Sequence, residues 1–411
     1  MTGSERGPIE RPALSRCIRV PADEFAERYW GREPLLSTAA ELGAGFDDLF
    51  SVAAVDELIT RRGVRTPFIR MANEGAVLAA SAYTASGGFG AEVADQVSSD
   101  KVLAEFAGGA TIVLQGLHRL WPPIIDHTRE LIDDLGHPAQ VNAYVTPPSS
   151  QGFDPHYDTH DVFVLQISGE KHWRIHAPVH VDPLRAQPWD QHRGAVARAA
   201  TGEPVIDAVL RPGDALYLPR GWIHSATALG ATSVHLTIGM APFTHTDVVD
   251  VLLREVGENA ALRTSLPLGI DLRDEEALAP IVAQTVQALV EMLQQTDASR
   301  PAAVLANRFD GETRAEPVAP LATLEALATL DASTAVRWRA SLPVLVTTID
   351  DRVRIVGRAK TLSLPIEAEQ AVRRLAAGGT VRAGELPGLD AESAVVVVRR
   401  LMREGFVVAV A

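Results

Sequence analysis

The stretch QGFDPHYDTHDVFVLQISGEKHWRIH, residues 151–176, decides the fold. It places four ionisable residues, His156, Asp158, His160 and Asp161, next to the apolar run VFVLQI. That run has the β-branched and aromatic character of a buried strand, and the turn-forming SGE separates it from a second strand-like segment, KHWRIHAP. The sequence therefore predicts a cluster of ionisable groups at the mouth of a set of buried strands.

Short strands continue on both sides of this stretch. Between about residues 138 and 243, apolar runs alternate with Gly, Pro and Ser turns, and no long helical pattern intervenes. The runs are AQVNAYVT, DVFVLQI, KHWRIHAP, DAVLRPGDALYLP and TSVHLTIGM. Strands at this spacing predict a β-sandwich or a small barrel.

Helical patterns flank the strand-rich region. Residues 19–60 have apolar side chains at helical spacing, as do TDVVDVLLREVGENAALRTSL and DEEALAPIVAQTVQALVEMLQQT after residue 245. The last hundred residues combine strand-like segments with two helices and a terminal strand, which predicts a winged-helix-like module. We expect three parts: a mainly β domain at 1–245 with N-terminal helices, an amphipathic helical region at 246–310 and the C-terminal module at 311–411.

Composition excludes several classes of protein. The chain has 411 residues, a net charge of −14 and a single cysteine, Cys17. One thiol excludes an internal disulfide framework and an all-thiolate metal site, and a reducing cytoplasm is the expected compartment. The N-terminus shows no apolar signal segment, and no apolar run is long enough for a membrane span. Residues 311–411 hold 13 Lys and Arg against 12 Asp and Glu, so this module lacks the basic surface that DNA binding requires.

Spacing alone suggests a metal site. In a strand, residues i and i+2 share a face, so His156 and Asp158 present imidazole and carboxylate side by side. This pair supplies two of the three ligands of the 2-His-1-carboxylate triad that holds non-haem Fe(II). A polar surface turn explains a lone H-x-D equally well. The third ligand must come from another strand, and spacing does not choose between His224, after a Pro-Gly turn, and His235.

Lys171 follows His156 by fifteen residues. Its neighbours Trp173 and Ile175 alternate onto one strand face, which predicts that Lys171 points into the same interior. Because lysine is seldom buried without a partner, an anionic ligand inside the barrel is one interpretation. A solvent-exposed lysine at a hairpin edge is the other.

The joint pattern of H-x-D, Lys171 and LPRGWIH resembles the JmjC-type 2-oxoglutarate oxygenases, which have the cupin or double-stranded β-helix fold. More narrowly, NAYVTPPSSQGFDPHYDTHDVFVLQISGEKHWRIHAP, GDALYLPRGWIHSATA and SVHLTIG resemble the ribosomal oxygenase branch. The likeness covers about residues 20–245 and extends more loosely to the C-terminal module. It implies that residues 246–310 form a dimerisation region.

The resemblance implies a role for particular residues. His156, Asp158 and His224 correspond to the metal ligands, and Lys171 to the cation that pairs with the distal carboxylate of 2-oxoglutarate. Asn142 and Tyr144 correspond to residues near the substrate. Three further residues are expected to support the site through hydrogen bonds: His160, Asp161 and His235.

The implied activity is hydroxylation of a protein side chain, using Fe(II) with 2-oxoglutarate and O₂ as cosubstrates. The expected substrate is a histidine or arginine of a ribosomal protein or other basic protein, and the expected assembly is a homodimer without direct DNA or membrane binding. Two alternatives remain open. One is an oxygenase that tailors a peptide or small natural product, and the other is a non-enzymatic cupin and winged-helix binding protein.

Overall fold

The computed structural model describes residues 11–410 except 74, 91, 149, 151–153 and 358–359. Residues 1–10, where no secretory signal is expected, and the QGF of the opening stretch lie outside the described residues. The chain divides into two compact units, one ending at Pro242 and the other beginning at Phe243. No helix among the described residues is both long and apolar enough to cross a membrane.

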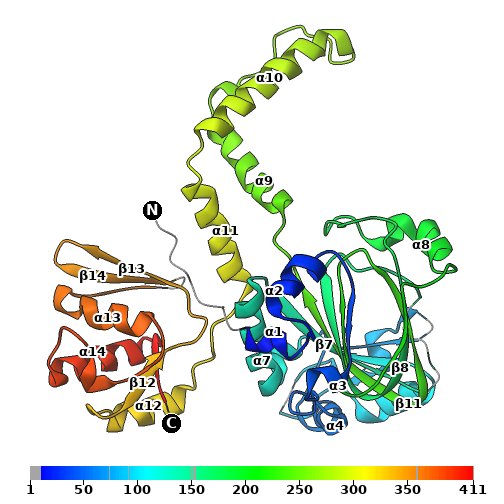
Figure 1. The fold of residues 1–411 in the computed structure, drawn as a ribbon, viewed down its shortest axis with the longest axis horizontal. Coiled ribbons are helices and arrows are strands. Elements are labelled where there is room, and N and C mark those ends of the chain that lie inside the picture. The colour runs from blue at the N-terminus through cyan, green and yellow to red at the C-terminus, as the bar shows by residue number, and fades with distance from the viewer. Residues whose placement is uncertain are drawn as a thin grey trace. The chain divides into compact units, whose positions relative to one another are not determined.

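A nine-stranded sheet dominates the first unit (Figure 1). Every pairing in it is antiparallel, and the strand order is β1-β10-β8-β11-β7-β6-β2-β3, with β9 also paired to β8. The strands are β1 (Leu35–Ser37), β2 (Ile69–Asn73), β3 (Ala76–Val77), β6 (Thr111–Leu114), β7 (Ala139–Thr146), β8 (Asp161–His176), β9 (Ile206–Leu210), β10 (Ala215–Leu218) and β11 (Ile223–Met240). A separate pair joins β4 (Thr84–Ala85) to β5 (Gln96–Val97).

Two of these strands are much longer than the sequence pattern predicts. The segments DVFVLQI and KHWRIHAP, expected to be separated by a turn at SGE, form the single strand β8. The first part of β8 pairs with β10, its last part pairs with β9, and β11 follows both parts. The expected hairpin is therefore wrong, because β8 runs on through SGE: Ser168 pairs with Val234 and Glu170 with Leu229 of β11, with a register shift between the two pairs.

Gly169 explains how the strand passes through this point. Its φ is +64°, and a Cβ at this position would lie 2.2 Å from the carbonyl oxygen of Thr232. Only glycine tolerates both the left-handed backbone and such a close approach of β11. The glycine that looks like a turn residue in the sequence allows two long strands to touch.

Helices cover the first unit. They are α1 (Pro12–Ser15), α2 (Ala22–Glu24), the π-turn η1 (Phe25–Tyr29), α3 (Ala39–Leu42), α4 (Val52–Arg61), η2 (Ala80–Ala82), α5 (Ser99–Ala107), α6 (Leu117–Leu120), α7 (Pro122–Leu135), η3 (Trp189–His192) and α8 (Arg193–Ala199). The helical pattern predicted over residues 19–60 is interrupted after Tyr29. Gly31 adopts a positive φ of 67°, Pro34 follows, and residues 35–37 pair with β10 as β1. Both residue types stop a helix, and the chain enters the sheet instead.

The first unit's core and the barrel interior are distinct. Phe25, Phe163 and Tyr217 are buried in the main core beneath the N-terminal helices. A smaller apolar cluster that includes Trp173 and Leu218 lies on the other side of the same strands. Successive side chains of a strand point to opposite faces, so one strand serves both layers. This alternation is what places polar residues into the barrel without breaking the main core.

The second unit contains a helical segment and a mixed segment. Its elements are α9 (His245–Arg254), η4 (Glu255–Glu258), η5 (Ala261–Arg263), α10 (Glu275–Gln295), α11 (Ser299–Glu312), α12 (Pro320–Thr329), β12 (Ala335–Trp338), β13 (Val344–Ile349), β14 (Arg352–Gly357), β15 (Thr361–Pro365), η6 (Ile366–Ala368), α13 (Glu369–Ala376), β16 (Thr380–Arg382), η7 (Ala383–Glu385), α14 (Ala391–Arg403) and β17 (Val407–Ala409). The predicted C-terminal helices and final strand are α13, α14 and β17, around a shared core. Strands β12, β15 and β16 were not predicted. The winged-helix identity and the boundaries at 245 and 310 stay predictions.

Candidate active site

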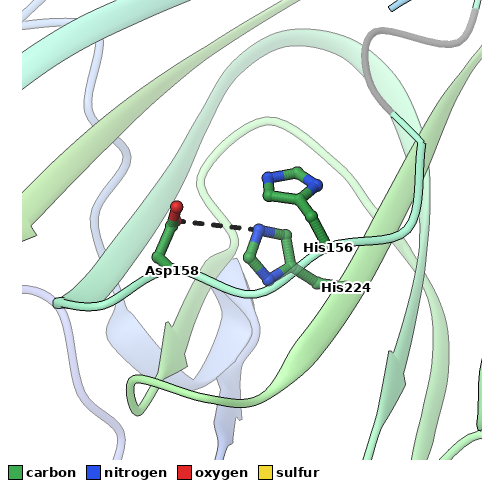
Figure 2. Close-up of side chains that lie close together, drawn as sticks. All are labelled: His156, Asp158 and His224. Carbon is green, nitrogen blue, oxygen red and sulfur yellow. Dashed lines mark ion pairs between the residues drawn. The ribbon is translucent and has the colours of Figure 1, made fainter. Parts of the chain in front are cut away.

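His156, Asp158 and His224 converge at one end of the barrel (Figure 2). Each offers one ligand atom, and these atoms all lie within 4.8 Å of one another. Nε2 of His224 is 3.8 Å from a carboxylate oxygen of Asp158. His224 is buried, whereas His156 and Asp158 are half-buried and open toward the cavity described below. The structure thus brings together the three residues that the sequence assigned to a metal.

Backbone hydrogen bonds bring the three ligand segments together. His156 and His224 form an antiparallel bridge, with N···O distances of 3.2 and 2.8 Å. The amide of Gly221 donates to the carbonyl oxygen of Asp158 at 3.0 Å. Because the main chain makes these contacts, the imidazoles and the carboxylate meet without help from an ion. The imidazole centroids of the two histidines are 4.4 Å apart.

The hydrogen bonds of the rings decide which nitrogen faces the cavity. Nδ1 of His156 is 2.7 Å from the carbonyl oxygen of Asp154, and Nδ1 of His224 is 3.0 Å from that of Trp222. A carbonyl accepts only, so each Nδ1 carries the hydrogen and each Nε2 keeps a lone pair. Carbonyl partners of this kind orient metal-binding histidines.

Electrostatics favour the protonation states that a metal requires. Burial, followed by the neighbouring His156, lowers the pKa of His224 to about 4, so its imidazole is neutral at pH 7. Burial acts to raise the pKa of Asp158, but His160, His224 and His156 together outweigh it, and the pKa lies below its ordinary value. A neutral His224 imidazole and an ionised Asp158 carboxylate suit the 2-His-1-carboxylate triad, in which His156 would supply the second imidazole. The residues therefore fit Fe(II).

A cavity of about 260 Å³ adjoins the three ligands. Aromatic and aliphatic side chains form most of its wall, including Trp173, Trp189 and Leu218. Trp189 comes from η3, in the long connection between β8 and β9, and its ring centroid lies 6.2 Å from that of His156. Sequence reasoning missed Trp189 because nothing in the 177–205 segment resembles a strand of the barrel.

Lys171 lies inside this cavity and not at a solvent-exposed edge. It is 4% exposed, and its ammonium donates a hydrogen bond to Oγ1 of Thr146 at 3.2 Å. Its Nζ lies 5.8 Å from the ring centroid of Trp173. Burial lowers the pKa of Lys171 to about 7, so the free protein holds this cation at a cost that an anionic ligand would remove.

His235 lies deeper in the same cavity. It is 3% exposed, stacks on Tyr144 with an interplanar angle of 6° and meets Trp173 edge-on. Burial, followed by nearby Lys171, lowers its pKa well below the ordinary value. Spacing alone left His224 and His235 as equal candidates for the third ligand, and it is His224 that adjoins His156.

The residues expected near the substrate have different surroundings. Tyr144 lines the cavity, and Arg70 of β2 is hydrogen-bonded to it. Arg70 pairs with Val113, and Val113 with Tyr144, in adjacent strands, so the three side chains share a face. The amide oxygen of Asn142 accepts a hydrogen bond from the Gly116 amide at 3.1 Å. Arg70 escaped the sequence analysis because its strand lies far from the motif.

His160 and Asp161 do not enter the triad. Asp161 is fully buried, accepts hydrogen bonds from the Tyr217 hydroxyl and the Arg220 amide at 2.9 Å each, and has its pKa raised by burial. His160 lies against Gly239, where an added Cβ would come within 3.0 Å of the imidazole. Nδ1 of His160 lies 3.4 Å from the carbonyl oxygen of Asp161. The role of both residues in supporting a metal site stays a prediction.

Comparisons with known proteins agree with this geometry. The JmjC domain family matches residues 119–248. The bifunctional lysine-specific demethylase and histidyl-hydroxylase NO66 of Drosophila persimilis is 35% identical over 196 residues, 44% of this chain and 28% of its own length. Ribosomal oxygenase 1 of Gallus gallus is 32% identical over 229 residues, 55% of this chain and 36% of its own length. The chain thus spans less than half the length of these curated relatives.

A solved structure matches nearly the whole chain. The Escherichia coli ribosomal oxygenase YcfD in complex with cobalt and 2-oxoglutarate aligns with a TM-score of 0.54 at 21% identity, covering 96% of this chain and 99% of that one. The likeness shows the fold, which confirms the predicted cupin domain with helices and a C-terminal α/β portion. The resemblance to JmjC ribosomal oxygenases is confirmed by the domain match and the curated relatives.

Proposed function

We propose that this JmjC-domain protein is an Fe(II)- and 2-oxoglutarate-dependent dioxygenase that hydroxylates a protein side chain. The observation that carries the proposal is the combination of three preorganised ligands with one buried cation, Lys171, in a single cavity. The ligands account for a metal, and the cation accounts for the distal carboxylate of a dicarboxylic cosubstrate. A structural metal site needs no such cation.

The residues of this chain have separate tasks in the proposed reaction. His156, Asp158 and His224 would hold Fe(II) and leave coordination positions for the keto acid and O₂. When bound, the iron and 2-oxoglutarate supply the oxidising chemistry, with release of succinate and CO₂. Lys171 forms a charge-assisted hydrogen bond to the distal carboxylate, and Thr146 orients the ammonium. Trp173 and Trp189 exclude water from the cavity.

We infer that the substrate is a basic ribosomal protein segment. The relatives of this chain include a ribosomal oxygenase and a bifunctional lysine-specific demethylase and histidyl-hydroxylase, which supports a histidine target ahead of an arginine. The net charge of −14 is complementary to such a partner and would speed its encounter with the protein. Tailoring of a peptide or small natural product keeps the same chemistry, and the product assay below distinguishes it.

We propose that residues 246–310 form a homodimer contact. Val282, Val286, Val290 and Leu293 of α10 are between 36% and 58% exposed and recur at helical spacing, so they form an apolar stripe on one face. A stripe of this kind is typical of a helix that packs against another chain. A cytoplasmic location, expected from the single cysteine, is proposed with it.

The test offers the protein a mixture of ribosomal proteins as candidate substrates. Ribosomal proteins from cells that lack the gene are incubated with the full chain, Fe(II), 2-oxoglutarate and O₂, and analysed for succinate and for residues that gain one oxygen atom. We expect stoichiometric succinate and a single oxidised position, both absent with Asp158→Ala. Succinate formation without any oxidised ribosomal residue would favour another substrate. A lack of metal and cosubstrate binding would favour a non-enzymatic binding protein.

A further inference from the structure

The turn Pro219–Gly221 connects β10 to β11 and is linked to two residues of the triad, Asp158 and His224. The amide of Gly221 donates to the carbonyl oxygen of Asp158 at 3.0 Å. Three residues later His224 makes its backbone bridge to His156. A displacement of this turn therefore moves Asp158 and His224 relative to one another, although the turn itself supplies no ligand.

The side chain of Asp161 anchors this turn. Its side chain is fully buried, one carboxylate oxygen accepts the Arg220 amide at 2.9 Å, and the other accepts the Tyr217 hydroxyl at 2.9 Å. The Arg220 guanidinium lies 3.9 Å away and also pairs with Asp182 at 3.3 Å. A buried carboxylate is tolerated only with such partners, so its geometry is tightly determined.

Residues 31–32 of the N-terminal segment form hydrogen bonds with Tyr217 and Trp222, on either side of the same turn. The amide of Gly31 donates to the Tyr217 hydroxyl at 2.8 Å, and the indole nitrogen of Trp222 donates to the carbonyl oxygen of Arg32 at 3.1 Å. A chain of hydrogen bonds thus runs from residues 31–32 through Tyr217 and Asp161 to the turn. Each member comes from a different part of the sequence, so folding of the N-terminal segment and of the ligand turn are coupled.

We propose that Asp161 is a positioning residue, which fixes the 219–221 turn so that Asp158 and His224 reach a single metal ion. The inference rests on the proposed metal site and adds the group that sets its geometry. Metal affinity then depends on Asp161 although it does not touch the ion. Partners of this kind typically contribute 10- to 100-fold in metal affinity.

Asp214 offers a matched control at the opposite end of β10. It is 7% exposed, and its carboxylate accepts the amides of Ala39 and Arg211 at 2.7 Å each. Asp214 therefore anchors a turn of the same sheet by accepting two hydrogen bonds, as Asp161 does. Its turn, however, contacts no ligand residue, so loss of Asp214 tests the effect of general destabilisation.

The experiment measures Co(II) binding by the full chain and its Asp161→Ala, Asp161→Asn, Tyr217→Phe and Asp214→Ala variants. Co(II) is the probe because its absorption spectrum reports coordination geometry as well as affinity. Thermal midpoints are recorded for all variants. We expect Asp161→Ala to weaken Co(II) binding about 10-fold or more and to alter the spectrum. Asp161→Asn, which still accepts the Arg220 amide, should recover part of the affinity, and Asp214→Ala should stay within about twofold of wild type at a comparable loss of thermal midpoint.

The outcomes separate the inference from the proposed function. Equal Co(II) affinities in Asp161→Ala and Asp214→Ala, at similar thermal midpoints, would overturn the positioning role alone. If Asp161→Ala does not fold, Tyr217→Phe decides the question, because it keeps the ring and removes only the two hydrogen bonds of the hydroxyl, one to Asp161 and one from the Gly31 amide. An unchanged affinity and spectrum in Tyr217→Phe would then overturn the inference. A wild-type chain that binds no Co(II) would overturn the proposed metal site and this inference with it.

Discussion

Replacement of Lys171 by methionine tests the cosubstrate half of the site. Methionine keeps the length and volume of the side chain in a buried position, so the wall of the cavity is preserved. The change removes the ammonium that we assign to the distal carboxylate of 2-oxoglutarate. It leaves the three metal ligands untouched, so metal and cosubstrate binding can be measured separately.

The expected magnitude follows from burial. Truncating one partner of a buried, hydrogen-bonded charge pair costs about 2–5 kcal/mol, which corresponds to a dissociation constant about 30-fold to about 4,000-fold higher. Because the pKa of Lys171 is about 7 in the free protein, protonating it at pH 7 subtracts only about twofold from wild-type affinity. The net loss is therefore about 15-fold or more. Metal affinity should change by less than about threefold, since Lys171 contacts no ligand atom.

The assay is calorimetric titration of the Co(II)-loaded protein with 2-oxoglutarate, after a separate titration with Co(II). Lys171→Arg is the control, because it retains the charge and the ability to bind a carboxylate. Equal 2-oxoglutarate affinity in wild type and Lys171→Met would refute the assignment. A parallel loss of Co(II) affinity in Lys171→Met would show that the substitution disturbs the site as a whole.

Three further predictions use the same protein. Because 2-oxoglutarate needs the protonated ammonium, its affinity should fall as pH rises above about 7, by up to about tenfold per pH unit, and Lys171→Arg should abolish this slope; an equal slope in both proteins would point to another group. The folded-state pKa of Lys171 is depressed, so the unfolded wild-type chain binds more protons than the folded one between pH 7 and 10, and wild-type stability rises with pH over this range. Urea titrations should therefore show that the stability advantage of Lys171→Met over wild type shrinks as the pH rises from 7 to 10. A constant difference would contradict the depressed pKa. Gly169→Ala should destabilise the first unit by at least about 1–3 kcal/mol, the cost of a φ of +64° at a residue with a side chain, and the clash with the Thr232 carbonyl adds to this cost; an unchanged thermal midpoint would contradict the close contact.

The sequence was most informative where function depends on local spacing. His156 and Asp158 are two residues apart, and Lys171 follows in the same stretch, so their association did not depend on knowing the topology. The choice of His224 over His235 required the resemblance, because both histidines lie in or near strands of the barrel. The structure adds the physical reason: β11 begins at Ile223, and its first residues bridge to His156, whereas His235 is twelve positions further into the barrel.

Sequence reasoning failed where a contact joins distant segments. SGE reads as a turn from its composition, but β8 runs on through it and resumes its pairing with β11 after a register shift, and Gly169 allows the two backbones to touch there. Arg70 and Trp189 line the cavity from segments with no motif. The Tyr217–Asp161 hydrogen bond links residues 56 positions apart, and Gly31 joins it from 186 positions away. Each of these contacts depends on tertiary packing, which no local pattern reports.

The most direct test of the central claim is anaerobic titration of the Fe(II)-loaded chain with 2-oxoglutarate, followed by visible absorption. Chelation of Fe(II) by the keto acid produces a charge-transfer band that neither component gives alone. The account predicts this band in wild type, its loss in His224→Ala, and its appearance in Lys171→Met only at much higher 2-oxoglutarate concentrations. A wild-type protein that binds Fe(II) and gives no band, or a His224→Ala variant with the full band, would contradict the account.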